Sequence, residues 1–592
     1  MFKTHSDEDL LLHPRKNFGR IGALCSAVML FFCGCGSTAD NTTADNPALT
    51  ANNGKVKYFP AVMEGKWSLE IEDIKAEFEF NQDGLRDLWE VAGKSFPTAT
   101  RAICRNRFTL PEAGRVVLGM GCDWWLVCRI DGKEILSTLA HGNRVYPVAV
   151  DNYVYEIDLD AGIHEIELDV KCGDLSFMTA FGNVEPVDTT IMYEPLLTDF
   201  APGRVTVGFV TGSGVPAAVD YRKKGETQWT RAWHLIGGQK ASLERVHRVE
   251  LRNLAPDTDY EYRLVTEHPH RNYREDYSIV RSFRSAPDKF REFSVLIIGD
   301  TQGAWSDRTA RVKTITQQDA FKRADLLGHV GDYCDSTADI EQSIFPGLFD
   351  TYNGKLLLPV RGNHEYLGKE STLWFKYFGN SMKLMKYADT AFLLIDCGNG
   401  VWKPAPAPSV MNVPEPFWAE QKEWLEKAVA SEEFQSARYR VLLAHGTPFG
   451  DASADLPGPI RDLIDPVFGG SSPRERLDLW VGGHLHIPMR SIPGKNQFFA
   501  RQELKPQKAV GTNYKFPIVL LGGPRGKEPE WNLSLTSVEL LFTADGIRCQ
   551  HRDLSGDLMD DFTVQSGGKV QTNFIRSDFK IVDVTESTAA KN

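Results

Sequence analysis

The chain has 592 residues, a hydrophobic fraction of 42%, a charged fraction of 25% and 13 tryptophans. This composition excludes a disordered chain, and the length, far beyond that of one hydrophobic core, predicts several domains. The formal net charge of −12 repels nucleic-acid phosphates, and the sequence holds no long Lys/Arg run that would overcome this repulsion locally. We therefore expect no nucleic-acid-specific binding.

Residues 1–35 are predicted to form an export leader. Three basic residues precede the apolar stretch 21–32, which is shorter than the roughly 20 residues that span a bilayer. Gly34 before Cys35 resembles a bacterial lipobox, in which the Cys is lipidated; a plain cleaved secretory signal is the alternative. With 36–55 as a polar linker, we expect an exported protein of the bacterial cell envelope or periplasm, lipid-anchored at Cys35.

Cysteine usage is compatible with export but does not demand it. Three of the 10 cysteines lie in the leader, and four more fall in one N-terminal region: Cys104, Cys122, Cys128 and Cys172. Because spacing establishes no disulfide, paired cysteines and isolated buried thiols both remain open.

Residues 56–185 are predicted to form a β-sandwich that resembles the jelly-roll modules of exported enzymes. Apolar and polar residues alternate with period two over 153–170. The dipeptide Asp131-Gly132 between two apolar runs predicts a hairpin with a primed turn. Trp124 and Trp125 offer a glycan contact through this N-terminal β domain, although on a strand pair we expect at least one of them in the core.

Residues 186–288 are predicted to form a second all-β sandwich. Tyr260, Tyr262 and Leu264 share one face of a strand after a Pro turn. This pattern resembles a fibronectin type III sandwich, in which the Tyr anchors the strand corner by hydrogen bonding back along the chain. Three histidines of the segment are expected to face solvent and are given no role: His247, His268 and His270.

From residue 289 strands alternate with helical stretches, which predicts an α/β domain over 289–565 and a C-terminal tail over 566–592. Residues 417–429 carry apolar side chains at helical spacing, and we expect these to pack on a sheet. The predicted fold class is therefore multidomain, with two N-terminal all-β sandwich domains followed by an α/β domain.

Five short motifs follow predicted strands of the α/β domain. They are Gly299-Asp300-Thr301-Gln302, Gly331-Asp332, Gly362-Asn363-His364-Glu365, Ala444-His445 and Gly482-Gly483-His484-Leu485-His486. Sites of α/β folds lie at strand ends, and each motif brings oxygen or nitrogen ligands to one. Each motif alone is weak, since an Asp after a strand is commonly a helix cap. Together, in this order and with helix-length separations, they are specific.

The motif set resembles the calcineurin-like metallophosphoesterase family, whose motifs run Asp-x-His, Gly-Asp, Gly-Asn-His-Asp/Glu, His and Gly-His-x-His. The resemblance covers roughly residue 293 to the C-terminal strands and implies an α/β four-layer metallophosphoesterase domain. A fibronectin-like sandwich before this domain is similar to the domain order of purple acid phosphatases. The resemblance also implies two divalent or mixed-valence metal ions, of Mn, Fe, Zn or Ni. One ion would be held by Asp300, Gln302, bridging Asp332 and His486, and the other by Asp332, Asn363, His445 and His484.

The implied activity is hydrolysis of a phosphate ester. Two cations can clamp a phosphoryl group and lower the pKa of a bridging water, so that hydroxide attacks phosphorus in line. His364 would serve as general acid or hydrogen-bond donor to the leaving oxygen, with Glu365 orienting it. Arg361 would touch phosphate or be structural. We predict a phosphomonoesterase; a phosphodiesterase of the same fold and a non-catalytic envelope scaffold that binds glycan are the alternatives.

Two positions depart from the family pattern. Gln302 stands where the family usually has His, so the first metal gains a neutral oxygen or loses a ligand. Asp335 stands where purple acid phosphatases place a Tyr, and Tyr333 should point elsewhere, so we expect no iron-tyrosinate colour. His329 is expected to be packed inside the domain. The segments predicted as loops that build the substrate pocket are 400–416 and 450–473.

Overall fold

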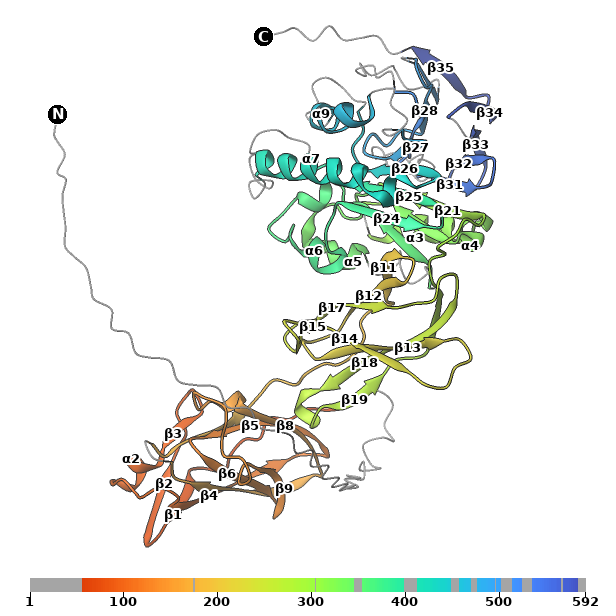
Figure 1. The fold of residues 1–592 in the computed structure, drawn as a ribbon. Coiled ribbons are helices and arrows are strands. Elements are labelled where there is room, and N and C mark those ends of the chain that lie inside the picture. Colours follow the sequence, from red (N-terminus) through yellow and green to blue (C-terminus); the bar gives the residue numbers. More distant parts are fainter. Residues whose placement is uncertain are drawn as a thin grey trace, which may run out of the picture. The chain divides into compact units, whose positions relative to one another are not determined.

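The structure is a computed structural model (Figure 1). It describes residues 56–173, 176–303, 305–344, 354–398, 413–448, 457–469, 476–495, 497–501, 514–523, 535–565 and 568–583. Residues 57–592 form one compact unit, which is described below. The predicted leader, linker and lipidated Cys35 therefore lie outside the described residues. No helix in the described ranges is long and apolar enough to cross a bilayer.

The first sandwich, formed by strands β1 to β10, consists of two antiparallel sheets (Figure 1). One sheet has the order β2 (Ile74–Phe78), β1 (Trp67–Ile71), β4 (Arg101–Leu110), β9 (Gly162–Lys171), β6 (Trp125–Ile130) and β7 (Lys133–Ser137). The other has the order β3 (Leu85–Asp87), β10 (Met178–Asn183), β5 (Gly114–Cys122) and β8 (Tyr153–Leu159), with helix α2 (Leu88–Ala92) after β3. β4 alternates buried and exposed residues, so its apolar side chains fill the space between the sheets. The Asp131-Gly132 turn joins β6 to β7 with φ angles of 50° and 75°, as a primed turn requires.

One expectation for this sandwich is wrong, and one open alternative is decided. Neither Trp124 nor Trp125, at the start of β6, is buried: Trp124 is 44% exposed, and its ring meets that of Trp125 edge-on. The seven cysteines in the described ranges are all free and buried. The isolated-thiol alternative therefore holds.

The second sandwich is formed by strands β11 to β20. One face has the order β17 (Val246–Arg252), β12 (Arg204–Val210) and β11 (Leu196–Ala201). The other has β14 (Thr230–Trp233), β13 (Ala217–Lys223), β18 (Asp259–His268) and β19 (Arg274–Tyr277), with β20 (Arg281–Arg284) also on β18 and the small hairpin β15 (Leu235–Ile236) and β16 (Gln239–Lys240) beside it. The backbone N–H of Ala255 donates to Tyr260 Oη at 2.8 Å, which is the predicted corner bond.

The histidines of this sandwich are not at the solvent-facing positions expected of them. His247 and His268 are buried, and His270 is half-buried. His247 stacks on Phe209 and lies 3.1 Å from Thr211 Oγ1, so tertiary packing places it in the interior. The expectation from residue type alone was wrong.

The third domain is built on two mixed sheets (Figure 1). The first has the order β23 (Leu356–Pro359), β22 (Leu326–His329), β21 (Phe293–Ile298), β31 (Ser537–Phe542), β32 (Gly546–Arg552), β33 (Leu558–Gln565) and β34 (Val570–Ile575). The second has β24 (Lys383–Tyr387), β25 (Thr390–Ile395), β26 (Tyr439–Ala444), β27 (Leu479–Gly482), β30 (Ile518–Leu520), β28 (Met489–Ser491), β29 (Gln497–Arg501) and β35 (Phe579–Asp583). The central parallel strands β21, β22, β25, β26 and β27 are buried along their whole length, as strands covered on both faces must be.

Helices cover the outer face of each sheet. The helices α3 (Trp305–Gln317), α4 (Asp319–Arg323), α5 (Ile340–Ile344) and α6 (Leu373–Phe378) share a core with the first sheet. The helices α7 (Pro414–Ala430), α8 (Glu432–Gln435) and α9 (Pro457–Phe468) share a core with the second. A third core fills the space between the sheets. These four layers after two sandwiches confirm the predicted fold class, and α7 packs on its sheet through Trp418 and Leu425 as expected.

Two segments differ from their sequence expectation. The predicted tail, 566–592, carries β34 and β35, which pair with β33 and β29 and so extend both sheets. The predicted loop 450–473 contains α9, while 449–456, 470–475 and most of the predicted loop 400–416 lie outside the described residues.

Candidate metal centre and active site

The five motifs meet because they follow the carboxyl ends of five parallel strands: β21, β22, β23, β26 and β27. The strands are buried and mostly apolar, and the residues that follow their carboxyl ends reach the shared space. Glycines make the approach possible. A Cβ on Gly331, which has φ of +95°, would lie 2.7 Å from Gly362 Cα, and a Cβ on Gly483 would lie 2.3 Å from Asp300 Oδ2.

Four of the predicted ligands have left-handed backbone conformations. Their φ angles are 51° at Asp300, 57° at Asp332, 69° at His484 and 55° at His486. A non-glycine residue held there costs about 1–3 kcal/mol, and such residues persist only where the surrounding structure fixes them. Their concentration at one point marks a functional site.

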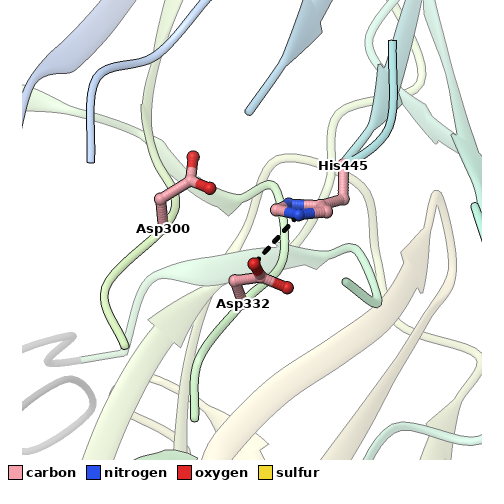
Figure 2. A group of neighbouring side chains, drawn as sticks. All are labelled: Asp300, Asp332 and His445. Carbon is pink, nitrogen blue, oxygen red and sulfur yellow. Dashed lines mark ion pairs between the residues drawn. The ribbon is translucent and has the colours of Figure 1, made fainter. Parts of the chain in front are cut away.

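Asp332 is the residue on which the site converges. Ligand atoms of Asp300, Asp332 and His445 all lie within 4.8 Å of one another, and all three residues are buried. Figure 2 shows the three side chains entering from separate loops, with His445 Nε2 facing Asp332 Oδ2 at 3.1 Å. The other Asp332 oxygen accepts from the backbone N–H of His364 at 3.1 Å.

A first group of ligands gathers on one side of Asp332. Gln302 Nε2 lies 3.2 Å from Asp332 Oδ2 and 3.1 Å from His486 Nε2, and His486 Nε2 lies 3.3 Å from Asp300 Oδ1. Asp300 Oδ2 and Gln302 Oε1 are buried with no hydrogen-bond partner in the described structure. Two unpartnered buried oxygens are unfavourable unless a ligand satisfies them.

A second group gathers on the other side. Asn363 Oδ1 lies 3.0 Å from His445 Nε2 and 2.9 Å from His484 Nδ1. His445 Nδ1 donates to the carbonyl of Val330 at 2.9 Å. A second ring nitrogen bound to a carbonyl is the arrangement that orients metal-binding histidines. The structure thus brings the side chains of all seven predicted ligands together around Asp332.

The ionisable side chains of the centre are buried, and both burial and their neighbours shift their pKa values. Burial opposes ionisation of Asp332, but the facing His445 holds the pKa of that carboxyl well below its usual range. Burial also opposes charging of His445, yet Asp332 raises its pKa to about 9. Burial and the neighbouring His445 lower the pKa of His484 to about 3, and burial raises the pKa of Asp300. Asp332 therefore stays ionised at neutral pH, with positive charge on His445 facing it, and a metal ion bound there would take over the role of that charge.

His364 lies at the open side of the centre. Its side chain is 29% exposed, and its Nε2 lies 3.8 Å from Asp332 Oδ2. Nδ1 lies 2.9 Å from the carbonyl of Asp335, and because a carbonyl only accepts, Nδ1 carries a proton. The Asp335 side chain in turn accepts from the backbone N–H of Gly303 at 3.1 Å. Asp335, which stands in place of the Tyr of purple acid phosphatases, thus fixes the ring of His364.

Glu365 was expected to orient His364, and this expectation is wrong. Its buried carboxylate accepts from four backbone N–H groups, those of Asp332 (3.0 Å), Tyr333 (2.7 Å), Cys334 (3.2 Å) and Gly362 (2.8 Å). These bonds join the turn that carries Asp332 to the turn that carries Asn363. Glu365 therefore positions two predicted ligands through the backbone.

The remaining neighbours are structural. Arg361 is buried, donates to the carbonyls of Glu365 and Ser371, and stacks on Tyr366, so it is the structural alternative that holds. Tyr333 stacks on His329 with ring centroids 3.7 Å apart. His329 is buried and lies 3.0 Å from Thr301 Oγ1, as expected. Sequence reasoning missed Arg311 of α3, which donates to the Gln302 carbonyl at 3.2 Å and has no motif that would reveal it.

The donor set fits a pair of metal ions. It offers carboxylate, amide and imidazole groups and no thiolate, which suits Mn, Fe, Zn or Ni. Asp300 Oδ2 is a buried oxygen that the described residues leave without a partner and that such an ion would satisfy.

Residues 293–488 match the family model of the calcineurin-like phosphoesterases, so this segment is a calcineurin-like phosphoesterase domain. The family consists of metal-dependent phosphoester hydrolases with dinuclear centres. No curated protein matches the chain.

Several solved structures are similar over long stretches. Purple acid phosphatase PPD1 from yellow lupin (Lupinus luteus) seeds is 15% identical, covering 79% of this chain and 93% of its own, with a TM-score of 0.46. GAP50, the anchor in the inner membrane complex of Plasmodium, is 12% identical, covering 46% and 89%, with a TM-score of 0.31. A two-domain fibronectin type III segment of chicken tenascin is 20% identical, covering 32% and 95%, with a TM-score of 0.14. With TM-scores below 0.5, none of these matches bears on activity.

Proposed function

We propose that the protein is an exported dinuclear-metal phosphoesterase that hydrolyses a phosphomonoester. The observation that carries this proposal is the division of seven side chains into two groups that share buried Asp332, with two buried oxygens left unpartnered. A phosphate ester is the substrate class of the family matched by residues 293–488.

Asp300, Gln302, Asp332 and His486 would hold one ion, and Asp332, Asn363, His445 and His484 the other. Bound there, two cations supply Lewis-acid polarisation of a phosphoryl oxygen and a water of lowered pKa as the nucleophile. Contacts within the chain hold the Asp332 carboxylate in place for these ions. Asp332 Oδ2 contacts both Gln302 of the first group and His445 of the second, and Oδ1 accepts from the His364 backbone N–H, so this one carboxylate joins the two groups.

His364 would supply the proton that the leaving oxygen needs. With Nδ1 bound to the carbonyl of Asp335, only Nε2 is free to exchange a proton, and Nε2 points to the open side beside Asp332. A donor at that atom would protonate an alkoxide as it departs, and the ring would recover its proton from solvent. A positioned acid of this kind contributes about 10²–10⁴-fold to a rate.

Metal-stripped protein tests this proposal with a nitrophenyl phosphomonoester and a bis-nitrophenyl phosphodiester, each with Mn²⁺, Zn²⁺, Fe²⁺ or Ni²⁺ restored. We expect metal-dependent turnover with a higher kcat/KM for the monoester. A preference for the diester would replace the monoesterase with a phosphodiesterase of the same centre. Absence of turnover with every metal would overturn the enzymatic proposal in favour of a binding scaffold.

We further propose that the protein is lipid-anchored at Cys35 in the bacterial cell envelope, and that the exposed Trp124 contacts glycan there. Support for the anchor comes from the leader sequence, and support for the contact from the exposed indole ring of Trp124 just before β6. The substitution Cys35→Ser should move the protein from the membrane fraction to the soluble fraction, as measured by fractionation of cells that express the variant. Trp124→Ala should weaken retention on cell-envelope polysaccharide without changing turnover, and equal retention would remove the glycan contact.

A further inference from the structure

Gln302 is the predicted ligand that departs from the family pattern, and its surroundings are unusual. The side chain is 5% exposed. Its Nε2 donates to Asp332 Oδ2 at 3.2 Å and lies 3.1 Å from His486 Nε2, while its Oε1 is buried without a partner. Arg311 holds the backbone carbonyl of Gln302 at 3.2 Å, so the side chain is presented from a fixed point.

The present orientation of this amide competes with a cation. Its NH₂ group joins Asp332 to His486, two of the groups that would hold an ion, and an NH₂ group cannot ligate a cation. To serve as a ligand the amide must turn over, which brings Oε1 to the ion and breaks both contacts. A histidine at this position would offer a ring nitrogen to the ion without having to turn over and break such contacts.

The two groups also differ in donor chemistry. Asp300, Gln302 and Asp332 give the first group three oxygens, with His486 as the only imidazole. The second group has two imidazoles, His445 and His484, with oxygens from Asp332 and Asn363. Oxygen donors suit Mn²⁺, and imidazoles suit Zn²⁺.

We propose that Gln302 makes the two ion positions unequal, so that the position on Asp300, Gln302 and His486 binds its cation more weakly and discriminates less in favour of Zn²⁺ over Mn²⁺. This inference rests on the proposed dinuclear function and adds an order of loading to it. The histidine-rich position fills first, and the Gln302 position is the exchangeable one. The difference in affinity is on the order of 10-fold, the size of effect that partners of a metal site usually have.

Calorimetric titration of metal-stripped protein with Zn²⁺, and separately with Mn²⁺, tests the inequality without reference to turnover. The wild type should show two binding events whose dissociation constants for Zn²⁺ differ by about 10-fold or more. Gln302→His should tighten the weaker Zn²⁺ event by about 10-fold and the weaker Mn²⁺ event by less. Gln239→His, which adds a histidine at an exposed position of β16, should change neither event.

A second variant guards against a histidine too large for the buried position. Gln302→Glu has the shape of the native side chain but cannot donate, and it should tighten the weaker Mn²⁺ event. Circular dichroism checks that both variants are folded. Equal affinities in the wild type, or Gln302 variants that leave both events unchanged, would overturn the inference.

The outcomes separate this inference from the proposed function. Two unequal ions without phosphoester turnover would leave the inference standing and remove the function. Phosphoester turnover by a protein that binds both ions with equal affinity would support the proposed function and overturn the inference. A wild-type protein that binds neither metal would overturn both.

Discussion

Two buried carboxylates, one in the second sandwich and one in the metal centre, have different surroundings. In the sandwich, buried Asp220 receives the guanidinium groups of Arg231 and Arg263 on its two oxygens at 2.7–3.2 Å. In the metal centre, Asp300 is equally buried, yet its Oδ2 has no partner in the described residues.

The difference separates a stabilising role from a binding role. A buried carboxylate with its partners complete needs nothing further, and removing it leaves charges unpaired. A buried carboxylate oxygen without a partner lowers the stability of the fold, and the fold tolerates this because a bound ligand supplies the missing interaction. The comparison predicts that mutations in the sandwich change stability alone, and that mutations in the centre change catalysis.

The largest effect should come from Asp332→Asn. The change removes the charge shared by both ligand groups, which is worth several kcal/mol of transition-state stabilisation. At about 1.4 kcal/mol per tenfold, kcat/KM for a nitrophenyl phosphate should fall by about 10³-fold or more. Asp319→Asn, at a side chain that is 89% exposed on α4, is the matched control and should keep full activity. Comparable turnover in the two variants would contradict the shared role of Asp332.

His364→Ala should lower kcat by about 10²-fold or more while metal content stays that of the wild type. If Nε2 gives a proton to the leaving group, the loss should be larger for an alkyl phosphate than for a nitrophenyl phosphate, whose leaving group needs no proton. Exposed His141→Ala serves as control. An equal loss for both esters would show that His364 does not act as the acid.

Asp220→Asn should destabilise the protein without touching kcat. Removing one partner of a buried ion pair costs about 3–5 kcal/mol, and since the two guanidinium groups are partly exposed we expect about 2–3 kcal/mol. Urea denaturation followed by fluorescence measures the loss, with Asp259→Asn, an exposed carboxylate of the same sandwich, as control. A fall in kcat at full stability would break the comparison.

The effect that is smallest near neutral pH concerns acid stability. Burial lowers the pKa of His247 to about 3 from an ordinary value near 6.5, so the unfolded chain binds this proton first as pH falls. His247 therefore costs stability below about pH 6.5, by at most about 1.4 kcal/mol per pH unit down to about pH 3. His247→Gln, which cannot titrate, should show a shallower fall in unfolding free energy between pH 6.5 and 4.5. Parallel slopes would mean that His247 is charged in the folded protein.

The sequence was sufficient to predict the order of domains and the residues gathered at the centre. Asp300, Asp332 and His445 each follow a buried, mostly apolar strand, and parallel strands bring such residues to one edge. The primed turn at Asp131 and the corner at Tyr260 were predicted for similar reasons, because their local chemistry admits few conformations.

Contacts set by packing could not be predicted in this way. The neighbours of Glu365 in the sequence give no sign that its carboxylate accepts four N–H groups, three of them on a turn more than thirty residues earlier. His247 was expected at the surface because histidines usually lie there, and at least one of Trp124 and Trp125 was expected in the core. The pairing of β35 with β29 joins residues some eighty positions apart, which no local pattern encodes.

The second sandwich also protects a vulnerable edge. β11 runs parallel to β23, with Leu197 opposite Leu356, so one continuous sheet passes from the sandwich into the phosphoesterase domain. If the chain were cut between them, β23 would present a row of unpaired backbone groups to solvent, a template for aggregation. An isolated phosphoesterase domain that begins at residue 289 should therefore self-associate, and a solubilising surface charge on β23 would be needed to keep it monomeric.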